Sequence, residues 1–128
     1  YNDHGIVLNS YNYGDQDRIF NIYTKENGLV KAICKSVRKP NSRFRGKVDK
    51  LSCSYFQFAK GKSLDIVSDC EQVSSFPLLR GDLSRLSYAI LILEIVNGFA
   101  HEQDTESEEI YNLLYRGLHN LQEVKDPA

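Results

Sequence analysis

The sequence lacks methionine, has only three cysteines and three prolines among 128 residues, and contains no long hydrophobic run. Its longest apolar stretch, residues 88–96, is about half as long as the roughly 18–20 residues that span a bilayer, and it includes Glu94. No basic segment followed by an apolar one opens the chain, as a secretory signal would. We therefore expect a cytoplasmic protein with no membrane partner. Because no methionine begins the chain, we also expect a trimmed piece of a longer product.

Patterns that support catalysis or metal binding are also missing. The sequence has no CxxC, HxxxH, HxE, GxSxG, Walker A or GxGxxG pattern, and its three cysteines are too widely spaced to indicate a disulfide framework or a zinc knuckle. It therefore predicts no catalytic residue, no metal site and no cofactor, and we do not expect an enzyme. The isolated thiols and imidazoles are Cys34, Cys53, Cys70, His4, His101 and His119.

One pair of carboxylates leaves an enzymatic alternative open. Asp15 and Asp17 lie close together in "GDQDR", residues 14–18, and a metal-dependent nuclease uses such pairs. That alternative predicts DNA cleavage that stops when a chelator is added. We favour a turn in which the aspartate side chains accept hydrogen bonds from nearby backbone amides, as aspartate commonly does in turns.

The formal net charge of −1 conceals an uneven distribution. Residues 1–75 contain 12 Lys and Arg against 8 Asp and Glu, whereas residues 76–128 contain 4 against 9. Residues 31–50 alone hold eight basic residues and one acidic residue, Asp49. This distribution predicts a positive face on the first half of the chain and a polyanionic partner for it.

The stretch "RKPNSRFRGK", residues 38–47, concentrates this charge and is called the basic loop below. Its Pro, Asn, Ser and Gly residues disfavour regular structure, so its cations can adapt to a phosphate backbone and release counterions. A solvated connector is the alternative for these cations. Phe44 has two open interpretations, a ring that stacks on a base or one that tucks beneath the loop. With two lysines from the preceding run, the predicted DNA-binding residues are Lys31, Lys35, Arg38, Lys39, Arg43, Phe44, Arg45 and Lys47.

The first half of the chain has the pattern of β-strands. Short runs rich in β-branched and aromatic residues are separated by turn signals such as Glu-Asn-Gly at 26–28 and Gly-Lys at 61–62. Five such runs predict a small barrel, closed or partly closed, because closure removes exposed strand edges. The expected strands are residues 5–14, 18–25, 29–37, 51–60 and 63–70.

The second half changes to a helical period with broad apolar faces. We expect Asp82 to be the N-cap of a first long helix and Gly98 to end it. Thr105 and Glu108 predict a capping box for a second helix, which ends before "KDPA", residues 125–128. The apolar faces need cover, either from each other and the barrel or from a missing part. The predicted organisation is a barrel domain, residues 1–75, and a helical segment, residues 76–128.

Three segments, in order along the chain, resemble the bacterial recombination mediator family RecO. They are YG-x-x-DRI at residues 13–19, R-K-P-x-S-R at 38–43, and F-P-x-L-R-x-D-L-x-R-L-x-Y-A at 76–89. The resemblance extends from Gly5 to about Val96 and continues weakly through the last helix. It implies a five-stranded OB-fold barrel followed by an incomplete α-helical domain. Many family members carry a four-cysteine zinc site in that domain, and this sequence has none.

The resemblance also implies a non-enzymatic role in recombinational DNA repair. The family binds single- and double-stranded DNA, anneals complementary strands and, with RecR, loads the recombinase RecA onto strands coated by single-strand-binding protein. Its contact with single-strand-binding protein lies largely in the helical domain. The residues that the resemblance assigns to DNA are Lys35, Arg38, Lys39 and Arg43, and charge alone adds Arg45 and Lys47.

A different class of protein remains as the alternative. In this interpretation the apolar helical half docks a protein partner, and the basic half provides solubility without binding nucleic acid.

Overall fold

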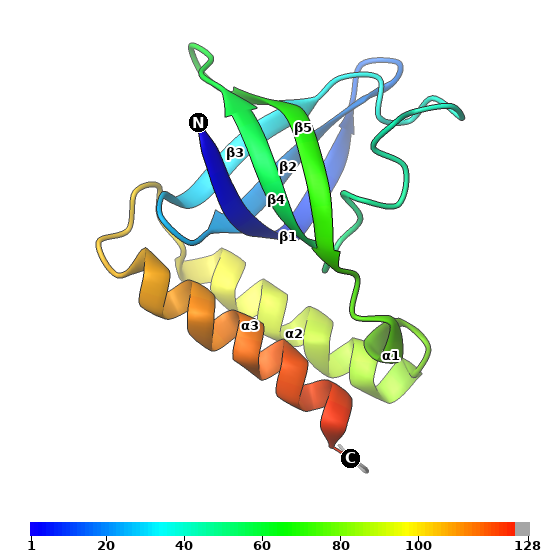
Figure 1. Cartoon of the computed structure of the whole chain (residues 1–128), viewed down its shortest axis with the longest axis vertical. Coiled ribbons are helices and arrows are strands. Elements are labelled where there is room, and N and C mark those ends of the chain that lie inside the picture. Colours follow the sequence, from blue (N-terminus) through cyan, green and yellow to red (C-terminus); the bar gives the residue numbers. More distant parts are fainter. Residues whose placement is uncertain (125–128) are drawn as a thin grey trace.

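The structure, a computed structural model, describes residues 1–124, and within them five strands are followed by three helices (Figure 1). Residues 125–128, before which the sequence predicts the second helix to end, lie outside the described residues. The strands are β1 (Asn2–Tyr13), β2 (Asp17–Thr24), β3 (Gly28–Cys34), β4 (Cys53–Ala59) and β5 (Asp65–Ser74). The helices are α1 (Pro77–Arg80), α2 (Leu83–Phe99) and α3 (Ser107–Glu123).

The strands close into a barrel in the order β1-β2-β3-β5-β4. β3 and β5 run parallel, and the other neighbouring strands are antiparallel. β1 reaches both of its neighbours because it is long and has a register shift between Val7 and Asn9, where such irregularities bend a strand. This is the topology of an OB-fold, so the predicted five-stranded barrel is confirmed.

Alternation along the strands produces two hydrophobic cores, one inside the barrel and one between the barrel and the helices. The outer core joins Ile6, Leu8 and Tyr23 of the barrel to buried leucines of the helices. The cysteines are buried free thiols, as expected for small hydrophobic residues. The inner core comprises Val7, Phe20, Ile22, Val30, Ala32, Cys34, Phe44, Val48, Phe56, Phe58, Val67 and Cys70.

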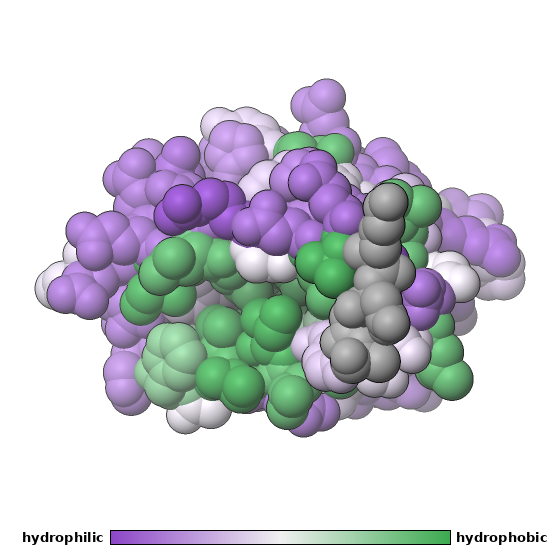
Figure 2. Space-filling view, turned by 90° about the horizontal axis from the view of Figure 1, so that it is seen from below, coloured by the Kyte–Doolittle hydropathy of each residue, from purple (hydrophilic) through white to green (hydrophobic). Residues whose placement is uncertain are grey.

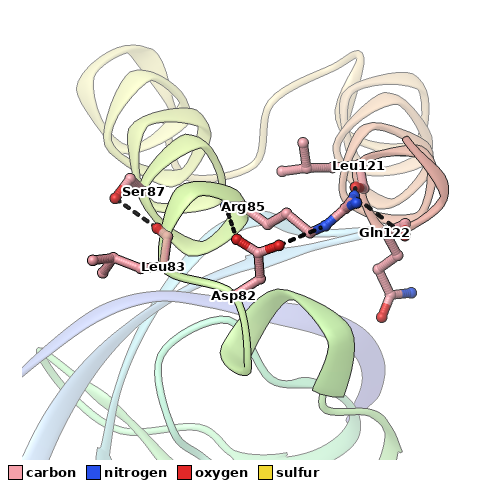
Figure 3. A network of polar contacts seen from close by, with 6 residues as sticks. All are labelled: Asp82, Leu83, Arg85, Ser87, Leu121 and Gln122. Carbon is pink, nitrogen blue, oxygen red and sulfur yellow. Dashed lines mark hydrogen bonds and ion pairs between the residues drawn. The ribbon is translucent and has the colours of Figure 1, made fainter. Parts of the chain in front are cut away.

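Helices α2 and α3 lie side by side beneath the barrel (Figure 1). Asp82 is the N-cap of α2, as predicted, and its carboxylate accepts hydrogen bonds from the backbone amide and Nε of Arg85 (Figure 3). The Arg85 guanidinium also donates to the carbonyl oxygens of Leu121 and Gln122 in the last turn of α3. One arginine therefore joins the start of α2 to the end of α3. Gly98 lies in the last turn of α2, which ends one residue later.

The predicted capping box of the second helix is wrong. α3 begins at Ser107, Glu106 occupies the N-cap position, and its side chain makes no capping hydrogen bond. The Ser107 hydroxyl donates instead to the carbonyl oxygen of Lys25, at 2.9 Å, so the start of α3 is held by the barrel. Two acidic residues, Glu108 and Glu109, occupy the first turn and complement the helix dipole.

Gly28 marks a close approach between the β2–β3 turn and the α2–α3 connection. Its φ is +66°, and a Cβ there would lie 2.7 Å from the amide nitrogen of Asp104 and 2.8 Å from the carbonyl oxygen of His101. Backbone hydrogen bonds join the two segments, and the Tyr23 hydroxyl donates to Asp104 at 2.9 Å. The helices are therefore fixed to this end of the barrel, which leaves the opposite end uncovered by them.

Seen from the side of the helices, hydrophobic side chains gather on the surface (Figure 2). On α2, Leu83 is 81% exposed and Ile95 57%, and on α3 Leu113 is 64% exposed. α2 is apolar on nearly all sides, a pattern typical of a helix that is covered all round. No helix among residues 1–124 is long and apolar enough to cross a membrane.

Candidate nucleic-acid interface

The β3–β4 connection, residues 35–52, contains the basic loop and runs along one side of the barrel (Figure 1). Its last residues reach the helical end, where Arg80 of α1 donates a hydrogen bond to the carbonyl oxygen of Lys50 at 2.8 Å. β3 ends earlier than the sequence suggested because the chain turns at Ser36, where φ is +60°. The Asp17 carboxylate accepts a hydrogen bond from the Ser36 amide at 2.7 Å and holds this turn against β2. Val48 then enters the inner core, so the connection is fixed at both ends.

Phe44 is part of the inner core and is only 5% exposed. Its inclusion among DNA-contacting residues is therefore wrong, and the alternative, that the ring tucks beneath the loop, is confirmed. The physical reason is that the barrel end is open to solvent unless a large apolar side chain fills it. Arg43 lies above this ring, with its guanidinium carbon 4.8 Å from the ring centroid.

The arginines of the basic loop are held by main-chain carbonyl groups. Arg38 donates from Nη2 to the carbonyl oxygen of Gly14, in the β1–β2 turn, at 2.6 Å. Arg43 donates to the carbonyl oxygen of Ser68 on β5, and Arg45 to that of Pro40 at 2.9 Å. A guanidinium has five N–H groups, so each of these arginines keeps donors for a ligand.

Lys31 and Lys35 lie on the β3 side of the barrel. Lys31 pairs in register with Asn21 of β2, on the outer face, and is exposed. Lys35 follows directly after β3 and is also exposed. Because side chains alternate along a strand, Ile33 shares their face. The structure therefore places both lysines on the outer face. Lys35 lies next to the start of the basic loop, whereas Lys31 lies farther along β3 and lines a cavity together with Glu102 of the α2–α3 connection.

Six of the predicted cations are exposed, and Lys47 is half-buried near the inner core. Burial raises the pKa of the Cys70 thiol to about 11, and the nearby positive charges of Lys47 and Arg43 act in the opposite direction. Among the described residues, ion pairs join Asp82 to Arg85 and His119 to Glu123, and no predicted cation takes part in one. The exposed cations are Lys31, Lys35, Arg38, Lys39, Arg43 and Arg45.

Two further lysines, Lys60 and Lys62, were missed by the sequence reasoning. They lie in the β4–β5 connection and, with Lys31, line a polar cavity of about 440 Å³. Asp65 and Glu102 also line it, so its positive charge is partly balanced. The Gly-Lys turn was visible in the sequence, but its proximity to β3 depends on the parallel pairing of β3 with β5.

Two exposed tyrosines, Tyr11 and Tyr13, were also missed. They are 56% and 55% exposed at the end of β1, beside the turn that Arg38 contacts. The sequence did contain a signal, because aromatic residues at positions i and i+2 of a strand share one face.

Asp15 and Asp17, the carboxylates of the nuclease alternative, do not come together with further metal-ligating side chains among the described residues. Asp17 Oδ1 is bonded to the Ser36 amide, while Asp15 is exposed in the β1–β2 turn. The amide that Asp17 binds belongs to the β3–β4 connection and not to its own turn. Among residues 1–124 there is no group of three or more His, Cys, Asp or Glu side chains placed to hold a metal ion.

Comparison with known proteins identifies the family. The model of the family "Recombination protein O N terminal" matches residues 1–76, which is more than half of the chain. The chain therefore belongs to the RecO family.

Curated relatives extend the similarity through the helices. The chain is 37% identical over 126 residues to the DNA repair protein RecO of Rubrobacter xylanophilus, covering 98% of this chain and 50% of the relative. It is 40% identical over 124 residues to the DNA repair protein RecO of Moorella thermoacetica, covering 97% and 46%. To the DNA repair protein RecO of Pelotomaculum thermopropionicum the chain is 38% identical over 114 residues, covering 89% of this chain and 44% of the relative. The chain thus spans about half the length of these relatives.

Proposed function

We propose that this chain is a non-enzymatic DNA-binding protein of recombinational DNA repair. It captures phosphates of single- and double-stranded DNA with the cations of the basic loop and of β3. Sequence preference is limited, because backbone contacts carry little sequence information and no recognition helix lies among these cations. The names of the curated relatives, each a DNA repair protein, support the repair context.

The observation that carries the proposal is that, among the described residues, no ion pair neutralises the exposed cations. Within residues 1–124, no carboxylate pairs with Lys31, Lys35 or the arginines of the basic loop. Main-chain carbonyl groups fix the arginines without neutralising them. Their full positive charge is therefore available to phosphates, and each contact releases counterions.

Annealing follows from the same electrostatics. Two strands bound to one positive surface repel each other less, so complementary bases meet more often. We further propose that the chain acts with RecR to load RecA onto strands coated by single-strand-binding protein, as the family resemblance implies. These partner contacts rest on the family and belong to a protein about twice the length of this chain.

The experiment is fluorescence anisotropy of a labelled oligonucleotide across a salt series. Replacing Arg38, Lys39 and Arg43 with alanine should flatten the slope of log K against log salt by about 0.7–0.9 per lost contact. The lower value applies to single strands and the higher to duplex. The same variant should anneal complementary strands more slowly.

Arg116→Ala is the control. Arg116 is exposed on α3, on the helical side of the molecule, so its loss removes a charge without touching the proposed surface. Its slope should equal that of the wild-type chain. An unchanged slope in the triple variant, with folding verified by a thermal melt, would exclude the basic loop from the binding site.

The alternative of a protein-interaction module rests on the apolar face of α2 and α3 (Figure 2). Nothing in the structure shows what covers this face, so we propose no occupant for it. The alternative would replace the proposal if the wild-type chain bound no strand at low salt. Cleavage of DNA that a chelator stops would favour the nuclease using Asp15 and Asp17.

A further inference from the structure

Tyr11 and Tyr13 present two aromatic rings to solvent on one face of β1. Their exposed fractions are 56% and 55%, although tyrosine rings usually bury much of their area. Among residues 1–124, neither ring stacks on another aromatic ring, and neither hydroxyl forms a hydrogen bond. More than half of each residue's surface is therefore open to solvent and available to a ligand.

The strand register places the two rings on the outer face of the barrel. Ser10 lies opposite Phe20, which points into the inner core, so Tyr11 points outward. Tyr11 lies opposite Ile19, and Ile19 lies opposite Ile33 of β3. Tyr11 is therefore in the same cross-strand row as the residue between Lys31 and Lys35, two strand spacings or roughly 10 Å away.

The start of the basic loop contacts the turn that directly follows the rings. Gly14, the residue after Tyr13, accepts the hydrogen bond from Arg38 at 2.6 Å. Tyr13 lies opposite Asp17, whose carboxylate holds the start of the β3–β4 connection. The exposed rings thus lie next to the site where Arg38 is held, and they share the outer face of the sheet with the lysines of β3.

We propose that Tyr11 and Tyr13 form the surface on which unpaired bases of single-stranded DNA stack, while the surrounding cations hold the phosphates. This inference rests on the proposed function and deepens it, because it assigns a preference for single strands to two named residues. Phe44 is buried and cannot supply that surface.

The chemistry favours single strands over duplex. Every base has a π face, so stacking on tyrosine tolerates any sequence. In a duplex the neighbouring base pairs cover those faces, and only the backbone is offered to the protein. Residues i and i+2 of a strand are roughly 6.8 Å apart, about twice the ~3.4 Å spacing of nucleotides along one strand of a duplex. Occupying both rings with adjacent bases therefore requires an unstacked strand.

The test compares three labelled ligands by anisotropy: an oligothymidylate, the same strand with abasic sites, and a duplex. The double variant Y11A/Y13A should lose roughly 5- to 150-fold in affinity for the oligothymidylate per stacked base. Its affinity for the abasic strand and the duplex should stay near that of the wild-type chain, and its salt slope should not change. The chain has no tryptophan, so quenching of tyrosine fluorescence by the oligothymidylate provides a second readout.

Two controls separate stacking from a structural role. Y11F/Y13F keeps the rings and should restore the affinity for the oligothymidylate. Tyr55→Ala removes a tyrosine that is 40% exposed on β4, opposite Glu71, and should have no effect on any ligand.

An equal loss on all three ligands, or no loss on the oligothymidylate, would overturn the inference while leaving phosphate binding intact. Failure of the proposed function has a different result, because the wild-type chain would then bind none of the three ligands in a salt-dependent way. That result would overturn the inference as well.

Discussion

The guanidinium of Arg38 and the carbonyl oxygen of Gly14 are 2.6 Å apart and form a hydrogen bond between the basic loop and the β1–β2 turn. A second backbone bond, from the Arg38 amide to the carbonyl oxygen of Gln16, reinforces the junction. Two segments that are far apart in sequence thus form one surface. A cation that would otherwise move with a solvated loop has a fixed position beside two exposed tyrosines.

Replacing Arg38 with lysine separates its charge from its geometry. We expect R38K to keep the salt slope of DNA binding but to bind several-fold more weakly, because an ammonium group lacks the planar fork that contacts a carbonyl and a phosphate together. R38A should lower the slope by about 0.7–0.9. Anisotropy in the same salt series measures both. Equal slopes for R38K and R38A would contradict a role of the charge.

Phe44 should affect stability and not binding. Because its ring is 5% exposed within the inner core, Phe44→Ala should lower the free energy of unfolding by about 3–5 kcal/mol. Urea denaturation followed by circular dichroism provides the measurement. Phe44→Leu, which leaves a smaller cavity, should cost less.

At a temperature where both Phe44 variants are folded, their affinity for single-stranded DNA should match that of the wild-type chain. A stable Phe44→Ala variant with weakened binding would show instead that the ring faces the ligand.

The barrel thiols should resist alkylation at neutral pH. Burial raises the pKa of Cys34 to about 12 and that of Cys70 to about 11, and the thiolate is the reactive form. At pH 8 the folded chain should therefore react with iodoacetamide at least about 100-fold more slowly than the urea-unfolded chain. Mass spectrometry of the quenched reaction measures the rates. Equal rates in both states would place these thiols at the surface.

The same shifts set an alkaline limit on stability. Since both thiols hold their protons more tightly when folded, stability is unaffected below the ordinary thiol pKa of 9.0 and falls as the pH rises through about 11 to 12. The double variant C34V/C70V should lose less stability over this interval in urea titrations. A loss identical to that of the wild-type chain would assign the alkaline limit to other groups.

Local pattern was enough to predict the five strands and the two long helices of this fold, but not the short helix α1. Alternating apolar residues and turn signals located all five strands, because a barrel requires one side chain in two to point inward. The N-cap at Asp82 was predictable for the same reason, since a cap uses only residues within one turn. The start of α3 was not predictable in this way. The expected capping box at Thr105 is absent, because the Ser107 hydroxyl is bonded to the carbonyl oxygen of the distant Lys25.

For the candidate site too, some features were predictable from the sequence and others were not. The sequence by itself determined the density of charge in residues 38–47 and the family to which the chain belongs, since both depend only on residue order. The tertiary structure decided that Phe44 fills the barrel and that Tyr11 and Tyr13 stay exposed, because burial depends on which strands close around a side chain. It also brought Arg38 to Gly14 through contacts between segments 24 residues apart, which no local pattern encodes.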